Sequence, residues 1–407
     1  MDVRQIMGAI LTFSMFLMLA NMIKRDHFDA DVFIDVPIMT SNVEQDVFKI
    51  TKHSLIQLTN ETLKKDGERL KLCWNNSLLP KGTNHSEGFV TFSLTDGPEY
   101  HVSQVANAVL VAKHLGATLV LPDIIGSNGE KRGFDEIYDV EKFITSMSGV
   151  VHVETRKHPE LKLVSVRVPY NANRNYILTN IQPLFYTTQY LRVITYFPSS
   201  TTSQGKVDKD MNPHSCWATF EALHLNPELQ EVLDSIVGKI KGHGLNGQFI
   251  AIDYKGEIVG TSACRNDGMN RIKSCYNPME IAQFLRRVGY QKDTTIYVTD
   301  QSRSDNGLNV LKDFYPNTFT KDDIMQETEK GKSELELKLI DFKLCSISDV
   351  FVPAKSGLFY ANVVANRIAS RKTEVFVPAQ VTSTLARDHI SSYISKRSHP
   401  AYACFCP

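Results

Sequence analysis

The sequence carries no excess charge of either sign, since 45 lysines and arginines balance 45 aspartates and glutamates. A chain that binds DNA or RNA usually has a basic excess, so the balance argues against a nucleic-acid partner. The seven cysteines form no Cys-x-x-Cys pair, which disfavours a thiolate zinc site. P-loop, His-Glu-x-x-His and Gly-x-Ser-x-Gly motifs are missing too, as are internal repeats and extended low-complexity segments. The usual signatures of NTPases, zinc proteases and serine hydrolases are therefore absent.

The composition is that of an ordinary globular protein, with 42% hydrophobic and 22% charged residues. At 407 residues the chain is too long for one compact core. Its length therefore predicts two domains.

An uncharged apolar run at residues 6–23 stands close to the N-terminus. A helix of this length reaches about 27 Å, enough for a thin bilayer. A cleaved signal peptide is the alternative, but its apolar core is usually shorter and ends at a small-x-small site, which is not evident here. The run therefore predicts a signal-anchor transmembrane helix after a cytosolic tail of residues 1–5. Arg4 and the Lys24–Arg25 pair flank it on both sides, so flanking charge leaves the orientation open.

Three N-glycosylation sequons follow the run in a polar stretch. Their acceptors are Asn60, Asn75 and Asn84. Three sequons close together favour a luminal location, so residues 24–87 are predicted to be the luminal stem of a single-pass type II membrane protein. Cysteines suit that oxidising compartment, and Cys264 and Cys275 are close enough in sequence to close a small disulfide loop. Seven cysteines leave at least one thiol unpaired.

From residue 88 onward the hydrophobic pattern is that of an α/β protein. Residues 88–94 are β-branched and aromatic, 100–116 carry apolar residues at helical spacing up to Gly116, and 117–123 form a second apolar run. A strand, a helix and a strand within about 35 residues form a βαβ unit, which predicts a parallel sheet.

A second α/β series follows the polar segment 195–215, which we expect to be the crossover between domains. The series comprises a helix capped at Asn226, strands at 247–254, 294–300 and 348–354, and helices after Asn277 and Gly357. Two α/β halves of similar size predict two Rossmann-like domains facing a cleft, at 88–215 and 216–407.

Two strand-to-helix turns are the candidate binding sites, because ligands of parallel sheets lie at the carboxyl ends of strands and helix N-termini offer free N–H groups to anions. The first turn contains Gly97, Glu99 and His101, and the second contains Lys355, Ser356 and Gly357. A lysine, a hydroxyl and exposed amides together suit a diphosphate. Ordinary turn chemistry explains the same glycines, and composition alone does not decide between the two interpretations.

Asp253, Lys255 and Glu257 complete the candidates at the end of the strand 247–254. Alternation places all three on one side if the strand continues, facing the predicted cleft. A solvated rim is the alternative and explains the pattern equally well.

These segments, in this order, resemble the plant O-fucosyltransferase-like family of glycosyltransferases, and within it the mannan synthesis-related proteins. The resemblance covers most of residues 88–406. The segments on which it rests include GFVTFSLTDGPEYHVSQVANAVLVAKHLGATLVLPD, CWATFEALHLNP, SCYNPMEIAQFLRRVGY and SDVFVPAKSGLFYANVVANRI.

The resemblance implies a GT-B fold, Golgi residence, a GDP-sugar donor and inverting transfer without a metal. The Gly97 turn matches the family's donor loop, although it lacks the Gly-Gly-x-Asn-Gln run common in relatives. Asp349, Ser356 and Gly357 fall in the family's nucleotide-binding segment.

One further departure concerns the family's His-Leu-Arg with a Glu two residues later. This chain has Asp253-Tyr254-Lys255 and then Glu257 at that place. Lysine keeps the positive charge of the arginine but loses its planar, bidentate fork. Donor binding and catalysis are therefore the properties that this replacement puts in question.

The sequence thus predicts a Golgi glycosyltransferase of mannan biosynthesis, with GDP-mannose or GDP-fucose as donor and a β-mannan-related glycan as acceptor. Glu99 is the first candidate for the catalytic base and Glu257 is the second. Lys255 is the candidate for the positive charge that stabilises the departing diphosphate. O-fucosylation of a protein or another glycan is the rival activity. The rival hypothesis from another functional class is that the protein is a non-catalytic partner of a mannan synthase. No metal cofactor is expected.

Overall fold

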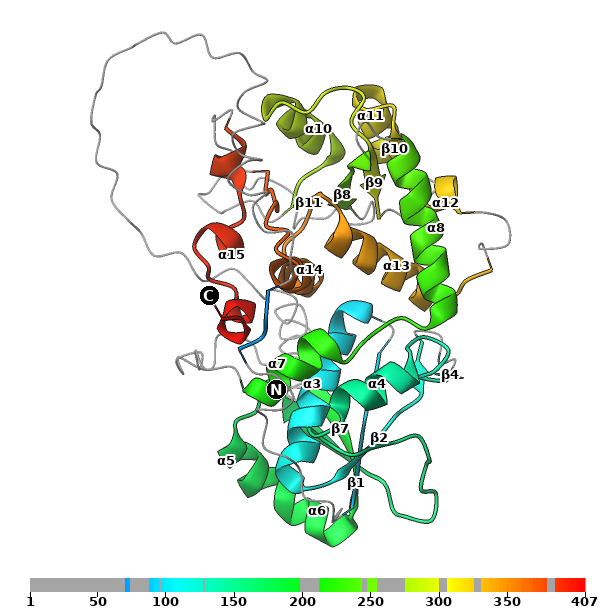
Figure 1. Ribbon diagram of the computed structural model, residues 1–407, viewed down its shortest axis with the longest axis vertical. Coiled ribbons are helices and arrows are strands. Elements are labelled where there is room, and N and C mark those ends of the chain that lie inside the picture. Colours follow the sequence, from blue (N-terminus) through cyan, green and yellow to red (C-terminus); the bar gives the residue numbers. More distant parts are fainter. Residues whose placement is uncertain are drawn as a thin grey trace, which may run out of the picture. The chain divides into compact units, whose positions relative to one another are not determined.

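The computed structural model contains two parallel β-sheets, one in each of the two predicted α/β halves (Figure 1). It describes residues 70–73, 88–95, 97–126, 129, 131–197, 212–243, 247–254, 275–299, 306–325, 331–378 and 385–406. The predicted α/β class with parallel sheets is therefore confirmed.

The first sheet has the strand order β5-β2-β1-β7-β6, and all its neighbouring strands are parallel. The strands are β1 (Phe89–Phe92), β2 (Thr118–Val120), β5 (Val153–Glu154), β6 (Val164–Pro169) and β7 (Tyr190–Tyr196). Helix α3 (Pro98–Leu115) joins β1 to β2 and packs on β1, β2 and β7. This connection is the predicted βαβ unit. A short antiparallel pair, β3 (Ile124–Ile125) and β4 (Lys131–Arg132), lies outside the sheet.

The second sheet has the order β10-β9-β8-β11, again with parallel neighbours. Its strands are β8 (Ile250–Asp253), β9 (Ile296–Val298), β10 (Thr318–Phe319) and β11 (Val350–Pro353). Alternate residues of β8 and β11 belong to different hydrophobic clusters: Ala251 and Phe351 to one, Ile252 and Val352 to the other. Side chains alternate across a strand, so both faces of this sheet are covered, as expected of a parallel sheet.

The remaining helices connect and cover these strands. They are α4 (Val140–Met147), α5 (Arg174–Tyr176), the π-helix η2 (Ile177–Ile181), α6 (Gln182–Thr188), α7 (Pro213–Glu221), α8 (Pro227–His243), α10 (Pro278–Arg287), α11 (Asn306–Phe314), α12 (Lys321–Ile324), α13 (Glu334–Ile347), α14 (Leu358–Ala369), α15 (Ser392–Ser395) and the 3₁₀ helices η6 (Ala386–His389) and η7 (Pro400–Cys404).

The predicted helix boundaries are set by the capping chemistry that the sequence indicates. Gly116 ends α3 in the left-handed conformation, with φ of 64°. Asn226 accepts a hydrogen bond from the Leu229 N–H at 2.8 Å at the start of α8. Asn277 and Glu280 form a reciprocal capping box at the start of α10, with both bonds at 2.9 Å.

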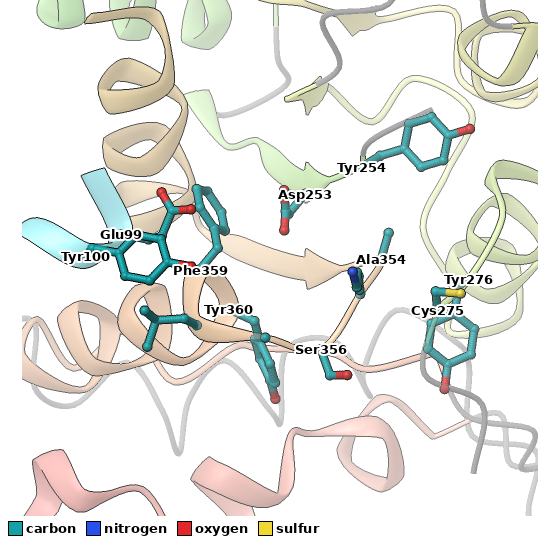
Figure 2. A pocket seen from close by; sticks show the side chains of 13 residues that line it. Glu99, Tyr100, Asp253, Tyr254, Cys275, Tyr276, Ala354, Ser356, Phe359 and Tyr360 are labelled. Carbon is teal, nitrogen blue, oxygen red and sulfur yellow. The ribbon is translucent and has the colours of Figure 1, made fainter. Parts of the chain in front are cut away.

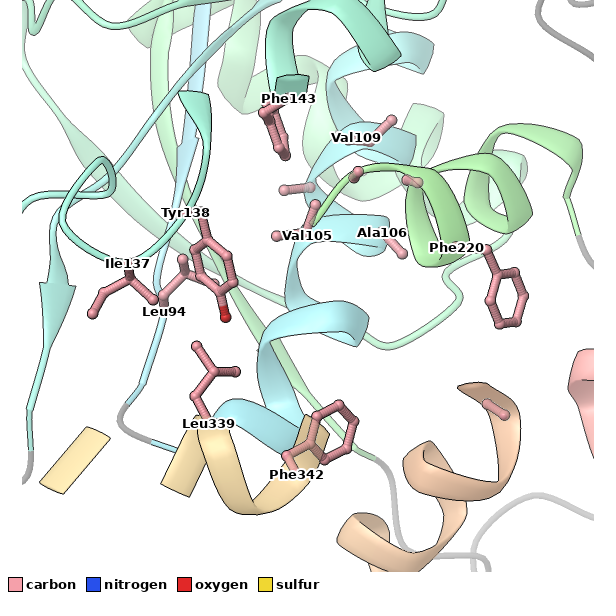
Figure 3. Close-up of a cluster of buried hydrophobic side chains, with 14 of the residues drawn as sticks. Leu94, Val105, Ala106, Val109, Ile137, Tyr138, Phe143, Phe220, Leu339 and Phe342 are labelled. Carbon is pink, nitrogen blue, oxygen red and sulfur yellow. The ribbon is translucent and has the colours of Figure 1, made fainter. Parts of the chain in front are cut away.

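One hydrophobic core runs from the first half of the chain into the second. Leu94, Val105 and Tyr138 belong to the same cluster as Leu339 and Phe342 of α13 (Figure 3). Helix α3 packs on α7, α13 and α14. The predicted boundary at 215/216 falls within α7, and the described residues of both halves form one compact unit. The division into two domains there stays a prediction.

Disulfides join the C-terminal residues to helix α7 and to residues 70–73. Cys216 of α7 is bonded to Cys404, and Cys73 is bonded to Cys406. Residues 70–73 run antiparallel to the chain end, with the Cys73 N–H donating to the Cys404 carbonyl at 3.0 Å. Cys275 is disulfide-bonded as well, and Cys345 is a free, buried thiol. Cys264 lies outside the described residues, so the predicted pairing with Cys275 stays a prediction.

None of the helices in the described part of the chain combines the length and apolar character that a membrane span requires. The predicted anchor at 6–23 lies outside that part, and so does the predicted stem at 24–87 except for residues 70–73. The three predicted glycosylation sites, Asn60, Asn75 and Asn84, are outside it too.

Candidate functional site

A pocket lies at the carboxyl ends of β8 and β11, where the chain leaves the second sheet. The two strands are parallel neighbours, with Asp253 paired to Pro353 at the last position of each. Open α/β sheets bind ligands at this edge. Residues from separate parts of the chain line the pocket: Glu99, Tyr100, Asp253, Tyr254, Cys275, Tyr276, Ala354, Lys355, Ser356, Gly357, Leu358, Phe359 and Tyr360.

The start of helix α14 supplies one wall. Gly357 precedes the helix with φ of 150° and ψ of −175°, a conformation that essentially only glycine adopts. The helix then begins at once with Leu358, so its first-turn N–H groups lie at the pocket together with the exposed Lys355 and Ser356. A helix N-terminus, an ammonium group and a hydroxyl form a set of donors for an anion such as a phosphate.

The start of helix α3 supplies another wall. Figure 2 shows Glu99 and Tyr100 on this helix, beside Phe359 of α14. Gly97 stands just before the helix, and a Cβ atom at this position would come within 2.6 Å of the Tyr100 ring. Glycine is therefore required at position 97 by the close approach of Tyr100, whereas its φ of −93° is ordinary.

A hydroxyl holds the Asp253 carboxylate at the end of β8. Thr299, the residue after β9, is buried, and its Oγ1 lies 3.2 Å from Asp253 Oδ1. The same oxygen accepts the Tyr254 N–H at 3.1 Å. Thr299 thus fixes both the direction of the Asp253 side chain and the path of the chain after it.

Residues 275–276 extend this edge beyond β11. Cys275 forms an antiparallel bridge with Lys355, and the Tyr276 N–H donates to the Ala354 carbonyl at 2.8 Å. Burial, with a smaller contribution from Glu280, raises the pKa of Tyr276 to about 12. The Tyr276 hydroxyl therefore keeps its proton at neutral pH.

A family model described as GDP-fucose protein O-fucosyltransferase matches residues 101–369. The chain belongs to the O-fucosyltransferase family, a family of glycosyltransferases. It is 44% identical over 423 residues to Protein MANNAN SYNTHESIS-RELATED 1 of Arabidopsis thaliana, covering 100% of this chain and 99% of that protein. Protein MANNAN SYNTHESIS-RELATED of Trigonella foenum-graecum is 41% identical over 425 residues, with the same coverage. Among solved structures, a crystal structure of POFUT1 in complex with GDP covers 73% of this chain and 100% of that chain, with 14% identity and a TM-score of 0.46.

In this member of the O-fucosyltransferase family, the structure brings together most of the predicted site residues that it describes. Five of them line the pocket: Glu99, Asp253, Lys355, Ser356 and Gly357. They come from both predicted turns and from the end of the predicted strand 247–254. The two turns meet at one pocket, which their spacing in the sequence does not predict.

Three predicted residues lie elsewhere or act indirectly. Gly97 borders the pocket only through Tyr100. His101 is fully buried, with Nδ1 2.6 Å from the Tyr138 hydroxyl and Nε2 bonded to the Thr95 carbonyl. The Asp349 carboxylate accepts the Phe249 N–H at 2.9 Å, at the amino ends of β8 and β11 and thus at the edge away from the pocket. Their roles in cofactor binding stay predictions. Lys255 and Glu257 lie outside the described residues.

Sequence reasoning missed Thr299, Tyr276 and most of the aromatic lining. Tyr276 follows a cysteine and precedes the Asn277 cap, so the local pattern indicates only a helix start. Thr299 stands at the end of a predicted strand, where the strand-end rule could have singled it out. In the described part of the chain no group of three or more His, Cys, Asp or Glu side chains is arranged to hold a metal ion. Metal independence itself stays a prediction.

Proposed function

We propose that this family member is a Golgi glycosyltransferase of mannan biosynthesis, which transfers a sugar from GDP-mannose or GDP-fucose to a β-mannan-related glycan. The observation that carries the proposal is the meeting of Glu99 with the Lys355–Gly357 turn in one pocket. Identity of 44% and 41% over whole chains to proteins named mannan synthesis-related supports the choice of pathway. The family description supports a GDP-sugar as donor.

The proposed reaction is a displacement with inversion at the anomeric carbon of the sugar. An acceptor hydroxyl forms the new C–O bond while the bond to the β-phosphate oxygen breaks, and GDP leaves with that electron pair. Glu99 takes the proton of the acceptor hydroxyl. Lys355, Ser356 and the first N–H groups of α14 stabilise the charge that develops on the departing diphosphate. No metal enters this scheme.

Lys255 is assigned a supporting role in the same scheme. It stands where the family usually has an arginine, so we expect a single charged contact to the diphosphate in place of a bidentate one. The rival interpretation, a non-catalytic partner that supports a mannan synthase, is favoured by this one replacement. O-fucosylation of a protein or another glycan is the rival enzyme activity and differs only in the acceptor.

Donor binding by calorimetry tests the proposal. The full chain is titrated with GDP, GDP-mannose, GDP-fucose and UDP-glucose, with and without manganese. Metal-independent binding of a GDP-sugar, weakened in Lys255→Ala, supports the transferase and identifies the donor. A folded chain that binds none of the four nucleotides contradicts it.

Complementation in cells separates the enzyme from the non-catalytic partner. Glu99→Ala and Lys255→Ala are expressed in cells that lack the protein, and their mannan is measured. An enzyme loses its effect on mannan with the Glu99 variant, whereas a scaffold retains its effect with both. Co-localisation of the full chain with Golgi membranes tests the expected compartment in the same cells.

A further inference from the structure

A single side chain links the two walls of the pocket. The Asn362 side-chain amide of helix α14 donates a hydrogen bond to the backbone carbonyl of Glu99, in the first turn of α3. The two residues are 263 positions apart in the sequence. Neither end of this bond is a group that the proposed reaction uses, because it engages the Glu99 main chain and leaves the carboxylate available.

The bond joins two helices that already pack together. Helices α3 and α14 are in contact, and Val105 and Val109 of α3 share one hydrophobic cluster with Val363 and Val364 of α14. Apolar packing holds the two helices together, but the hydrophobic effect itself is non-directional. A hydrogen bond has a defined length and direction, so the Asn362 bond adds a specific constraint on the register of the two helices.

That register decides where the Glu99 carboxylate stands relative to the start of α14. Asn362 lies five positions after Gly357, and its partner is the main chain of the candidate base itself. Catalytic groups are sensitive to displacements of about 1 Å, which can cost about 100-fold in rate.

We propose that Asn362 is a positioning residue, which sets the distance between the base Glu99 and the diphosphate-binding start of α14. The inference rests on the proposed transferase function for its kinetic part and on the contact alone for its structural part. Asn362 acts through Glu99 and touches no substrate.

The test compares two variants of the full chain with a matched control. Asn362→Asp keeps the size of the side chain and removes the donor, and Asn362→Gln keeps the donor on a longer stem. The control is Asn366→Ala, one turn later on α14, where the side chain donates to the Asn362 carbonyl at 3.2 Å within the same helix.

Hydrogen–deuterium exchange of the peptide that covers residues 97–104 is the structural readout. We expect exchange to rise about tenfold in Asn362→Asp, which corresponds to the loss of about 1.4 kcal/mol, and to stay at the wild-type rate in Asn366→Ala. Unchanged exchange in Asn362→Asp, or an equal rise in the control, overturns the inference.

Release of GDP from the donor identified by calorimetry is the kinetic readout. Asn362→Asp should lower kcat by about 10- to 100-fold, with the KM for the donor changed less than about threefold and the melting temperature preserved. Asn362→Gln should recover part of the kcat. A loss that appears in KM alone overturns the positioning role. If the wild-type chain binds no GDP-sugar, the proposed function fails, and the exchange measurement still decides whether Asn362 holds the start of α3.

Discussion

Gly97 and Gly357 precede the two pocket helices for different physical reasons, and this difference can be measured. At Gly97 a methyl group would come within 2.6 Å of the Tyr100 ring, so the ring would have to shift. We expect Gly97→Ala to cost about 1–3 kcal/mol of stability and to weaken donor turnover, because the displaced ring leaves the pocket wall. In a Tyr100→Ala background the same change should cause no further loss of turnover. Additive losses in the double variant would contradict the steric explanation.

At Gly357 the surrounding space is open and the backbone imposes the restriction. Among the described residues, no heavy atom outside Gly357 and its chain neighbours lies within 4 Å of the place that a methyl group would occupy, yet φ is 150°. Gly357→Ala should destabilise the protein by about 1–3 kcal/mol, as measured by urea denaturation. No second substitution nearby should relieve this cost, since there is no clash to remove.

Thr299 provides a further prediction at the scale of one side chain. Thr299→Val keeps the shape and removes the hydroxyl that serves Asp253 and the Tyr254 N–H. Leaving these buried groups without that partner should cost about 1–3 kcal/mol and weaken donor binding in calorimetry. Thr299→Ser keeps the hydroxyl and is the matched control. Equal stability and equal donor binding of the two variants would contradict the role of the hydroxyl.

Among the elements, helix α14 is fixed at its far end by a buried arginine. The Arg367 side chain is 0% exposed and donates to the carbonyls of Cys345, Ser348, Asp349 and Glu374 at 2.8–3.1 Å. Two of these acceptors, Cys345 and Ser348, lie at the C-terminal end of α13, where a cation complements the helix dipole. Burial lowers the pKa of Arg367 to about 10, so the guanidinium stays charged at neutral pH.

Replacing this arginine should therefore destabilise the contact between α13 and α14. Arg367→Met removes the donors from several buried carbonyls and should cost about 3–5 kcal/mol in urea denaturation. Arg367→Lys keeps the charge but lacks the planar fork that reaches acceptors on both sides, so it should recover less than half of the loss. An Arg367→Met variant as stable as the wild type would contradict this role.

The elements that can be predicted best from the sequence are those with long, periodic patterns and clear caps. Helix α3, with Val105 and Val109 at helical spacing and Gly116 at its end, matches its predicted range closely. Strands β5 and β6 escaped prediction, because Val153–Glu154 is very short and the burial of Val164–Pro169 is incomplete. The order of strands in a sheet cannot be read from the hydrophobic pattern either, because contacts between residues far apart in the sequence determine which strands pair.

For the candidate site, local sequence identifies single residues but not the residues that they meet. Lys355, Ser356 and Gly357 follow a strongly apolar strand, and strand ends can be recognised from local composition. The Asn362 contact joins residues 263 positions apart and has no local signature. The buried position of Arg367 cannot be predicted from local sequence either, because arginine in a helix is usually exposed.

At the scale of the whole molecule, a buried histidine makes stability depend on pH. His214, at the start of α7, is 8% exposed, and its Nδ1 has no hydrogen-bond partner within the described structure. Burial, and then the charges of Lys113 and His114, lower the pKa of His214 to about 4. Between pH 6.5 and 4 the unfolded chain therefore binds a proton that the folded chain does not.

Stability should accordingly fall as the pH drops through this window, by up to about 3 kcal/mol from this residue at about 1.36 kcal/mol per pKa unit. His214→Leu removes the titrating group, so its free energy of unfolding should vary less steeply with pH between 6.5 and 4. Identical slopes for His214→Leu and the wild type would assign the acid sensitivity to other groups.

The pairing of residues 70–73 with the C-terminal residues, together with the Cys73–Cys406 disulfide, places the first described segment beside the last one. The disulfide closes residues 73–406 into a covalent ring. A short peptide could join the ends, and a new opening at a surface turn such as Gly149 would give a circular permutant with the strands of both sheets intact. A reporter fused at the C-terminus would leave the body beside residues 70–73.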